Sequence, residues 1–367
     1  MSQNLLFTFT AFAVSIVCGF VLIPQIMNFC ARNSLYDIPN ERKVHHNTIP
    51  RLGGICFIPS MLLAFILAIA VFNRVTGEEQ ITMNTWSVMF LISLLIIYVV
   101  GTIDDLIGLK AQTKFVLQIL AATLMPLSGL YINNLYGFLG VTEIPFWIGA
   151  PLTVFVIVFV DNAMNLIDGI DGLAGGLSLL SLSGFLYCFM REGVWLYCIL
   201  IAGLIGVLIP YLYYNIWGDP LRNRKIFMGD AGSLSLGFIL GFLLIKFAMH
   251  NPSVMPYRND SLIISYTLLI VPTFDVVRVI IARLRSRRPL FGADKNHIHH
   301  KLMRSGLTQH QSLVVILLLA VFFIVFNLTL DTFMPVNIIV ILDVAVYVTF
   351  HLLLDMCIRN AGKKAFE

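Results

Sequence analysis

Long apolar runs alternate with short polar segments along the chain, and the polar segments hold almost all of the charged residues. A helix needs roughly 17 to 25 mostly apolar residues to cross the hydrocarbon core of a bilayer. The runs predict about eleven such helices, the shorter of which extend into flanking polar residues. The predicted spans are Leu5–Met27, Ile55–Phe72, Trp86–Val100, Phe115–Leu130, Phe146–Val160, Leu173–Met190, Trp195–Tyr214, Leu234–Phe247, Leu262–Ile281, Leu313–Leu330 and Val336–Met356.

Composition places the chain in the same class. Hydrophobic residues make up 58% and charged residues 12% of the sequence, and the mean hydropathy is +0.88. These values lie far outside the range of soluble globular proteins. No repeat, low-complexity tract or long linker divides the chain, so residues 1–367 are predicted to form a single, all-α, polytopic transmembrane domain. The net charge of +4 comes from the loops, and no nucleic-acid partner is expected.

Basic residues are concentrated in alternate loops. Because Lys and Arg are retained on the cytoplasmic side of a membrane, these loops are predicted to be cytoplasmic. The opposite loops hold only Arg74, Arg191 and Arg258. The N-terminus is therefore predicted outside and the C-terminus in the cytoplasm. Residues 1–4 contain no basic residue, so the first span is expected to be a retained helix rather than a cleaved signal peptide.

Acidic and polar motifs stand at the ends of spans, all on the predicted cytoplasmic side. Carboxylates near a bilayer are energetically costly and normally functional. The motifs are Asp104-Asp105, the run Asn162–Asp171, Asp230, Asp275, and the segment His297–His300 with Asp294. Together they predict one metal-phosphate site, built from loops near residues 37–54, 101–115, 161–173, 215–233 and 283–307.

The most specific motif is the run 161–173, whose recurring polar residues are Asn162, Asn165, Asp168 and Asp171. On an unbroken α-helix this spacing would rotate Asp171 about half a turn away from Asn162. Gly169 and Gly172 permit a break. The run therefore predicts a helix end, a tight loop and a new helix that starts near Leu173. The alternative is a turn that merely joins two spans.

The segment Phe227–Ser233 precedes the predicted eighth span. Helix N-termini offer free N–H groups and the positive end of the helix dipole. We expect this loop to hold a phosphate, with Asp230 binding the metal ion that bridges it. The alternative makes Ser233 an ordinary N-cap, with Gly232 providing clearance.

Asp104 and Asp105 are adjacent carboxylates at the cytoplasmic end of the third predicted span. Neighbouring carboxylates repel each other, which raises the proton affinity of one of them or recruits a divalent cation. Either outcome suits phosphoryl transfer. The alternative is a solvated pair that ends a helix.

Three histidines, His297, His299 and His300, lie in the most basic loop. Their spacing allows a structural zinc site, but no Cys or fourth ligand lies nearby in the sequence. Recognition of an anion is the preferred interpretation, and Arg288 is expected to contact a diphosphate. The neighbouring arginines are equally consistent with binding anionic lipid head groups.

The last predicted span contains Asp343, His351 and Asp355. Asp343 lies toward the middle of the membrane, where polar residues usually seek a partner on another helix. We therefore expect packing or a hydrogen bond at Asp343 rather than catalysis.

Taken together, these motifs resemble those of the bacterial polyprenyl-phosphate N-acetylhexosamine-1-phosphate transferases, in the GlcNAc-1-phosphate transferase branch of glycosyltransferase family 4. The resemblance runs from about Asp37 to Gly306. It is carried by Asp37–Pro39, Arg42–His45, Pro50–Gly54, Asp104–Leu109, Asn162–Gly176, Phe227–Ser233 and His297–His300. It implies a multi-helix enzyme of the bacterial cytoplasmic (inner) membrane, with its active site facing the cytoplasm. Asp161 departs from the family pattern, because that position is usually neutral.

The resemblance also implies a reaction. A UDP-sugar and undecaprenyl phosphate give undecaprenyl-diphospho-sugar and UMP, with Mg²⁺ or, in its place, Mn²⁺. The resemblance implies that Asp230 is a metal ligand and that Asp104 and Asp105 are the pair that binds or deprotonates the lipid phosphate. It implies that Asn162, Asn165 and Asp168 form the polar wall of the active site. It also implies that Asp171, Asn215 and Phe227 contact uracil. The His-x-His-His pattern of residues 297–300 resembles the branch that uses sugars without a peptide, which favours UDP-GlcNAc as donor.

Other functions stay open at this point. They are the UDP-MurNAc-pentapeptide phosphotransferase of peptidoglycan synthesis, a membrane nucleotidyl transferase that uses CTP, and a cation-coupled transporter. Transporters gather charges near the membrane midplane, often on broken helices, whereas here the charges lie at helix ends. One-step transfer and a two-step route through a phospho-aspartate both fit the residues. A homodimer is one assembly that the sequence leaves open.

Overall fold

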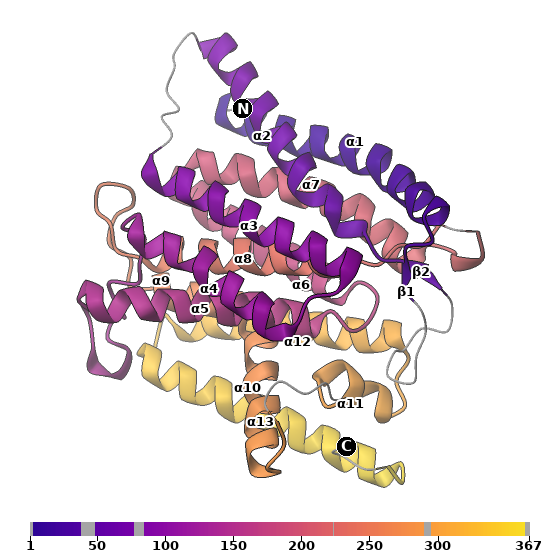
Figure 1. Cartoon of the computed structure of the whole chain (residues 1–367). Coiled ribbons are helices and arrows are strands. Elements are labelled where there is room, and N and C mark those ends of the chain that lie inside the picture. The colour runs from indigo at the N-terminus through magenta and orange to yellow at the C-terminus, as the bar shows by residue number, and fades with distance from the viewer. Residues whose placement is uncertain (1–2, 38–47, 77–83, 223, 290–294, 364–367) are drawn as a thin grey trace.

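The computed structural model describes residues 3–37, 48–76, 84–222, 224–289 and 295–363. It consists almost entirely of helices (Figure 1). The long helices are α1 (Gln3–Arg32), α2 (Phe57–Thr76), α3 (Thr85–Ile107), α4 (Ala111–Leu127), α5 (Phe146–Ile167), α6 (Leu173–Arg191), α7 (Trp195–Trp217), α8 (Gly229–Ala248), α10 (Ile270–Arg285), α12 (Gln309–Leu330) and α13 (Val336–Asn360). The shorter elements are α9 (Ser261–Thr267), α11 (Ile298–Arg304), the 3-10 turns η1 (Gly53–Cys56), η2 (Phe138–Gly140) and η3 (Pro220–Arg222), and the antiparallel strands β1 (Tyr36–Asp37) and β2 (Ile49–Pro50).

Nine helices of the described residues are long and apolar enough to cross a membrane. The prediction of an all-α, polytopic membrane protein is confirmed. The predicted span Leu262–Ile281 is not one continuous helix, because α9 and α10 are bent by 70° where they meet. In Figure 1, α10 runs across the other long helices. The predicted span Phe115–Leu130 corresponds to α4, whose 17 residues stand at the lower limit for crossing a bilayer. The count of about eleven needs both α4 and the bent pair to cross, so the count and the orientation stay predictions.

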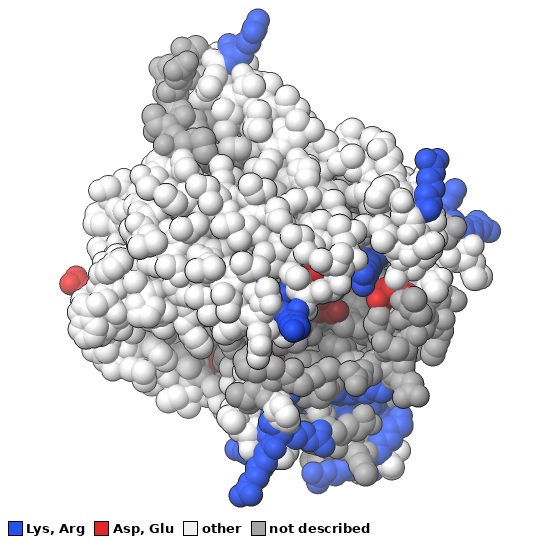
Figure 2. All heavy atoms as spheres, in the orientation of Figure 1, with Lys and Arg blue, Asp and Glu red and all other residues white. Residues whose placement is uncertain are grey.

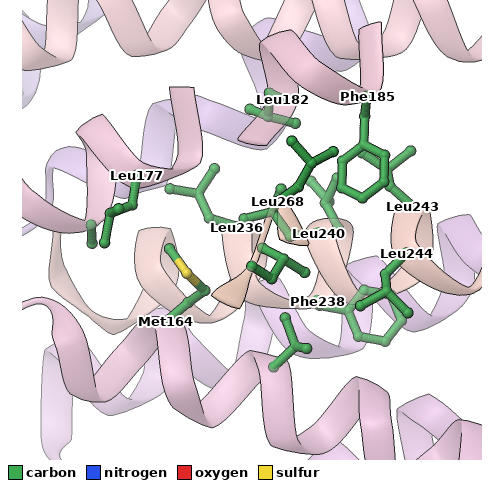
Figure 3. Close-up of a cluster of buried hydrophobic side chains, with 14 of the residues drawn as sticks. Met164, Leu177, Leu182, Phe185, Leu236, Phe238, Leu240, Leu243, Leu244 and Leu268 are labelled. Carbon is green, nitrogen blue, oxygen red and sulfur yellow. The ribbon is translucent and has the colours of Figure 1, made fainter. Parts of the chain in front are cut away.

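Helix α8 lies at the centre of the bundle. It contacts α3, α5, α6 and α9, and the most apolar 18-residue window of α8 is 100% buried. A helix that is apolar on every side is stable only when protein or lipid surrounds it completely. Figure 3 shows Leu236 and Leu240 of α8 gathered with Leu182 and Phe185 of α6 in the buried core.

Glycines allow neighbouring backbone to pack directly on the first turn of α8. A Cβ atom at Gly54 of η1 would lie 2.2 Å from the Cα atom of Gly232, and one at Gly101 of α3 would lie 2.6 Å from the Cα atom of Ala231. Larger side chains at Gly54 and Gly101 would push η1 and α3 away from α8. The ends of three segments that are distant in sequence therefore meet where α8 begins, near β1 and β2 (right-hand side of Figure 1).

We expect Gly54→Ala to lower the thermal unfolding midpoint of the detergent-solubilised protein. The added Cβ must displace backbone atoms of α8, and overpacking of this kind costs about 1–3 kcal/mol. Gly203→Ala in α7 is the matched control, because the nearest atom to a Cβ there would be 3.4 Å away. An unchanged midpoint for Gly54→Ala would contradict this packing.

Candidate active site

A polar cavity of about 400 Å³ opens at the end of the bundle where α8 begins. Figure 2 shows acidic atoms recessed in the surface on this side, beside Lys and Arg. The predicted site residues that line the cavity are Asp104, Asp105, Asn165, Asp168, Asp171, Asn215, Phe227, Asp230 and His300. Described residues of all five predicted loops line the cavity, with Asp37 and Arg51 contributed by the first loop. The predicted loops 37–54 and 283–307 include residues 38–47 and 290–294, among them Asp294, which lie outside the described residues.

An ammonium group lies between two carboxylates at the centre of the site. Lys114 Nζ donates to Asp104 Oδ2 (2.8 Å) and to Asp230 Oδ2 (2.9 Å). Asn165 Nδ2 donates to the other oxygen of Asp230 (2.7 Å) and to Ser233 Oγ (2.9 Å). These contacts join the ends of α3, α4, α5 and α8, so the two carboxylates are held in a fixed relation to one cation.

Asp105 caps the N-terminus of α8. Its two oxygens accept hydrogen bonds from the backbone N–H groups of Asp230 (2.8 Å) and Ala231 (2.9 Å). These two N–H groups, which were expected to face a phosphate, therefore already have a carboxylate acceptor, and phosphate binding by the segment Phe227–Ser233 stays a prediction. The expected loop Phe227–Ser233 is also shorter, because α8 begins at Gly229 and Ser233 lies inside the helix. Ser233 is thus not the N-cap.

The predicted break in the run 161–173 is confirmed. Helix α5 ends at Ile167 and α6 begins at Leu173, and Gly172 adopts φ +78°, a conformation that favours glycine. Asn215 Oδ1 accepts from the Gly172 N–H (2.6 Å), and Asn215 Nδ2 donates to the Ile226 carbonyl (2.9 Å). Asn215 therefore ties this loop to the segment before α8. Its contact with uracil stays a prediction.

Two carboxylates of this loop differ in their surroundings. Asp171 pairs with Lys225 Nζ at 2.7 Å. Asp168 makes no hydrogen bond or ion pair with another described residue. Burial, followed by the negative charges of Asp230 and Asp171, raises the pKa of Asp168 to about 7. Asp168 can therefore exchange a proton near neutral pH.

Asn162 does not line the cavity. Its Nδ2 atom donates to Gln118 Oε1 (2.9 Å) and to the Val158 carbonyl (2.8 Å), so it joins α5 to α4 instead of facing the site. Asp161, the departure from the family pattern, is 1% exposed and packs against Gly237 of α8. Both residues lie behind the wall of the cavity.

Asp275 does not belong to the site, contrary to expectation. It is fully buried and bonds to His297 Nδ1 (2.8 Å), the Ile298 N–H (3.0 Å) and Arg278 (2.7 Å). The carboxylate thus holds the N-terminus of α11 and fixes His297. The predicted contact of His297 with substrate is not supported, because its Nδ1 faces Asp275 and the ring is buried.

Of the three histidines, only His300 lines the cavity. His299 is 1% exposed, and a Cβ atom at Gly169 would lie 2.1 Å from its Nε2 atom. Burial lowers the pKa of His299 well below its usual range, so this ring packs in its neutral form against the loop that carries Asp168. Arg288 is exposed and is not among the cavity residues, so its predicted contact stays untested.

The expected hydrogen bonding of Asp343 is confirmed. Its Oδ2 atom accepts from the Tyr266 hydroxyl and from Asn327 Nδ2 (2.9 Å). These contacts join α13 to α9 and α12, far from the cavity. Asp355 of the same helix pairs with Lys301 of α11.

The sequence did not single out several residues of the site. Lys114 holds the two central carboxylates, and Arg51, Tyr211 and Gln309 line the cavity. A signal existed for both basic residues, because Lys114 follows the Asp104–Leu109 motif and Arg51 lies within the Pro50–Gly54 motif. No such signal existed for Tyr211 and Gln309, since aromatic and amide side chains are common near helix ends.

Comparison with known proteins identifies the family of the chain. The glycosyl transferase family 4 model matches residues 86–248. The probable undecaprenyl-phosphate N-acetylglucosaminyl 1-phosphate transferase of Bacillus subtilis (strain 168) is 32% identical over 331 residues, which cover 88% of this chain and 85% of that protein. The undecaprenyl-phosphate alpha-N-acetylglucosaminyl 1-phosphate transferase of Escherichia coli (strain K12) is 30% identical over 290 residues, 78% of this chain and 74% of the relative. The chain belongs to glycosyl transferase family 4, which confirms the resemblance seen in its motifs.

We expect Asp105→Ala to destabilise the protein by about 1–2 kcal/mol, because two N–H groups of α8 lose their acceptors. Asp105→Asn keeps one carbonyl acceptor and should lose less. Thermal unfolding of the purified variants in detergent measures both effects. Equal midpoints for Asp105→Ala and the unmodified protein would show that Asp105 does not cap α8.

Proposed function

We propose that the protein transfers N-acetylglucosamine 1-phosphate from UDP-N-acetylglucosamine to undecaprenyl phosphate. The products are undecaprenyl-diphospho-N-acetylglucosamine and UMP, and the reaction would start the synthesis of a cell-surface glycan. The names of the relatives from Bacillus subtilis and Escherichia coli support the acceptor and the transferred group. The observation that carries the proposal is the pair of carboxylates, Asp104 and Asp230, held around one cation in a polar cavity.

We also propose that Mg²⁺, or Mn²⁺, binds at Asp230 together with Asp104. The residues fit such an ion, because their carboxylate oxygens already converge on the ammonium group of Lys114. Within the described residues no group of three or more His, Cys, Asp or Glu is arranged to hold a metal ion. Mg²⁺ commonly binds through one or two carboxylates plus substrate phosphates. A bound ion would neutralise charge on the phosphates during transfer.

In this reaction an oxygen of the lipid phosphate bonds to the phosphorus that carries the sugar, and the bond from that phosphorus to UMP breaks. Such a transfer depends chiefly on alignment and neutralisation of charge. We propose that Asp168 accepts the last proton of the lipid phosphate, since its pKa of about 7 suits a general base near neutral pH. Asp105 is already bonded to backbone N–H groups, which leaves it a positioning role.

The function is tested with purified protein, undecaprenyl phosphate, Mg²⁺ and a panel of UDP-sugars, followed by mass spectrometry of the lipid product. We expect UDP-N-acetylglucosamine to give a diphospho-sugar lipid with release of UMP, and EDTA to stop the reaction. Exclusive use of UDP-MurNAc-pentapeptide, release of UDP, or no transfer from any UDP-sugar would overturn the proposal.

Matched variants locate the activity. Asp230→Ala should abolish transfer, because the proposed metal ligand and the partner of Lys114 are both lost. Asp343→Asn is the control, because it changes a buried carboxylate far from the cavity and keeps an acceptor for Tyr266. Near-normal transfer by a folded Asp230→Ala variant would contradict the site.

We propose that the cavity faces the cytoplasm of a bacterial cell, with the active site at the inner membrane. Leu221 of η3 lies at the cavity end and is 86% exposed, and Phe333 lies between α12 and α13 at the other end and is 79% exposed. In a background with the exposed Cys357 replaced by Ser, Leu221→Cys should react with an impermeant thiol reagent only in inverted vesicles. Phe333→Cys should react in cells whose outer surface is accessible to the reagent. The reverse pattern would show the opposite orientation.

A further inference from the structure

Among the described residues, the lining of the cavity carries more negative than positive charge, although the substrates of the proposed reaction carry phosphates. Six of its lining residues are carboxylates, and these are Asp37, Asp104, Asp105, Asp168, Asp171 and Asp230. Among the described residues that line it, Arg51 is the only Lys or Arg. Unless cations compensate, carboxylates in a cavity repel an anionic ligand. Binding of a phosphate in this cavity therefore requires positive charge that compensates these carboxylates.

The lysines next to the cavity are already engaged. Lys114 is shared between Asp104 and Asp230, at 2.8 and 2.9 Å. Lys225 pairs with Asp171 at 2.7 Å. Each lysine offsets charge that belongs to the cavity wall, so neither supplies uncompensated positive charge to a ligand.

Arg51 differs from these lysines. Its side chain makes no hydrogen bond or ion pair with another described residue, and its Nε atom is buried without a hydrogen-bond partner. Asp105 is close enough to interact electrostatically, but both of its oxygens accept from backbone N–H groups of α8. Buried polar groups of proteins are nearly always hydrogen-bonded. The guanidinium therefore has donors available for a ligand.

The backbone around Arg51 is fixed against the start of α8. The Phe227 N–H donates to the Pro50 carbonyl (2.7 Å), and the Gly53 N–H donates to the Phe227 carbonyl (2.9 Å). A Cβ atom at Gly229 would lie 2.2 Å from the Arg51 carbonyl oxygen. Arg51 is thus held at a constant distance from the helix turn that carries Asp230.

We propose that Arg51 is an anion-binding residue of the cavity, and that its guanidinium binds a phosphate oxygen of a substrate during transfer. The planar guanidinium can donate two parallel hydrogen bonds to one phosphate. The proposal rests on the proposed function for the identity of the phosphate, which belongs to the donor diphosphate or to the lipid acceptor. Arg51 offsets the negative charge that the cavity carboxylates impose on that phosphate.

The test compares Arg51→Gln and Arg51→Lys with Arg222→Gln as matched control. Arg222 lies at the same end of the protein, but it is exposed and pairs with Asp219. We expect Arg51→Gln to raise the KM of one substrate about tenfold or more, as loss of a charge-assisted hydrogen bond predicts. Arg51→Lys should recover part of this loss. Arg222→Gln should leave both KM values unchanged. A rise in KM for the UDP-sugar assigns the donor phosphate, and a rise for undecaprenyl phosphate assigns the acceptor.

A binding measurement separates this proposal from the proposed function. Thermal unfolding is followed with UDP or with undecaprenyl phosphate added, without turnover. One of these probes should stabilise the unmodified protein and Arg222→Gln, and stabilise Arg51→Gln much less. If each probe stabilised Arg51→Gln as much as it stabilises the unmodified protein, the role of Arg51 would be overturned. This holds even if no UDP-sugar were a substrate. Unchanged KM values for both substrates, or a fall in kcat alone that Arg51→Lys does not recover, would overturn it as well.

Discussion

The arrangement of the site depends on the hydrogen bonds between the Asp105 carboxylate and the first N–H groups of α8. A helix N-terminus leaves N–H groups without intrahelical partners, and Asp105 supplies acceptors for two of these groups in α8. The negative charge also suits the positive end of the helix dipole. Because Asp105 follows Asp104 directly, the same contact places Asp104 opposite Asp230. Gly101 makes it possible by letting α3 approach Ala231 closely.

This contact explains how so many carboxylates share one small cavity. Asp105 is hydrogen-bonded to backbone N–H groups, Asp104 and Asp230 share Lys114, and Asp171 pairs with Lys225. Asp168 is left without a partner among the described residues, and burial together with the negative charge of Asp230 and Asp171 raises its pKa. The cavity thus combines carboxylates in fixed positions with a carboxyl, that of Asp168, that has no hydrogen-bond partner among the described residues. Phosphoryl transfer needs both fixed charge and a group that can accept a proton.

The histidine segment is organised from outside the cavity. Asp275 of α10 holds the start of α11, and Asp355 of α13 pairs with Lys301 near its other end. His299 then packs on Gly169 while His300 reaches the cavity. The last helices of the chain therefore contribute to the site through packing, although only His300 and Gln309 from this part of the chain line it.

The sequence by itself determined the helical membrane architecture, because apolar runs of bilayer length satisfy their backbone groups only by forming helices. It also determined the break after Ile167, since the spacing of the polar residues and the two glycines are local properties. The tertiary structure decided which partner each charged group has. Asp105 meets Ala231 and Lys114 meets Asp230 across more than a hundred residues, so local spacing could not distinguish a capping carboxylate from one that faces substrate. The same reason hid the burial of Asp275 and the open guanidinium of Arg51, because both follow from which helix ends pack together.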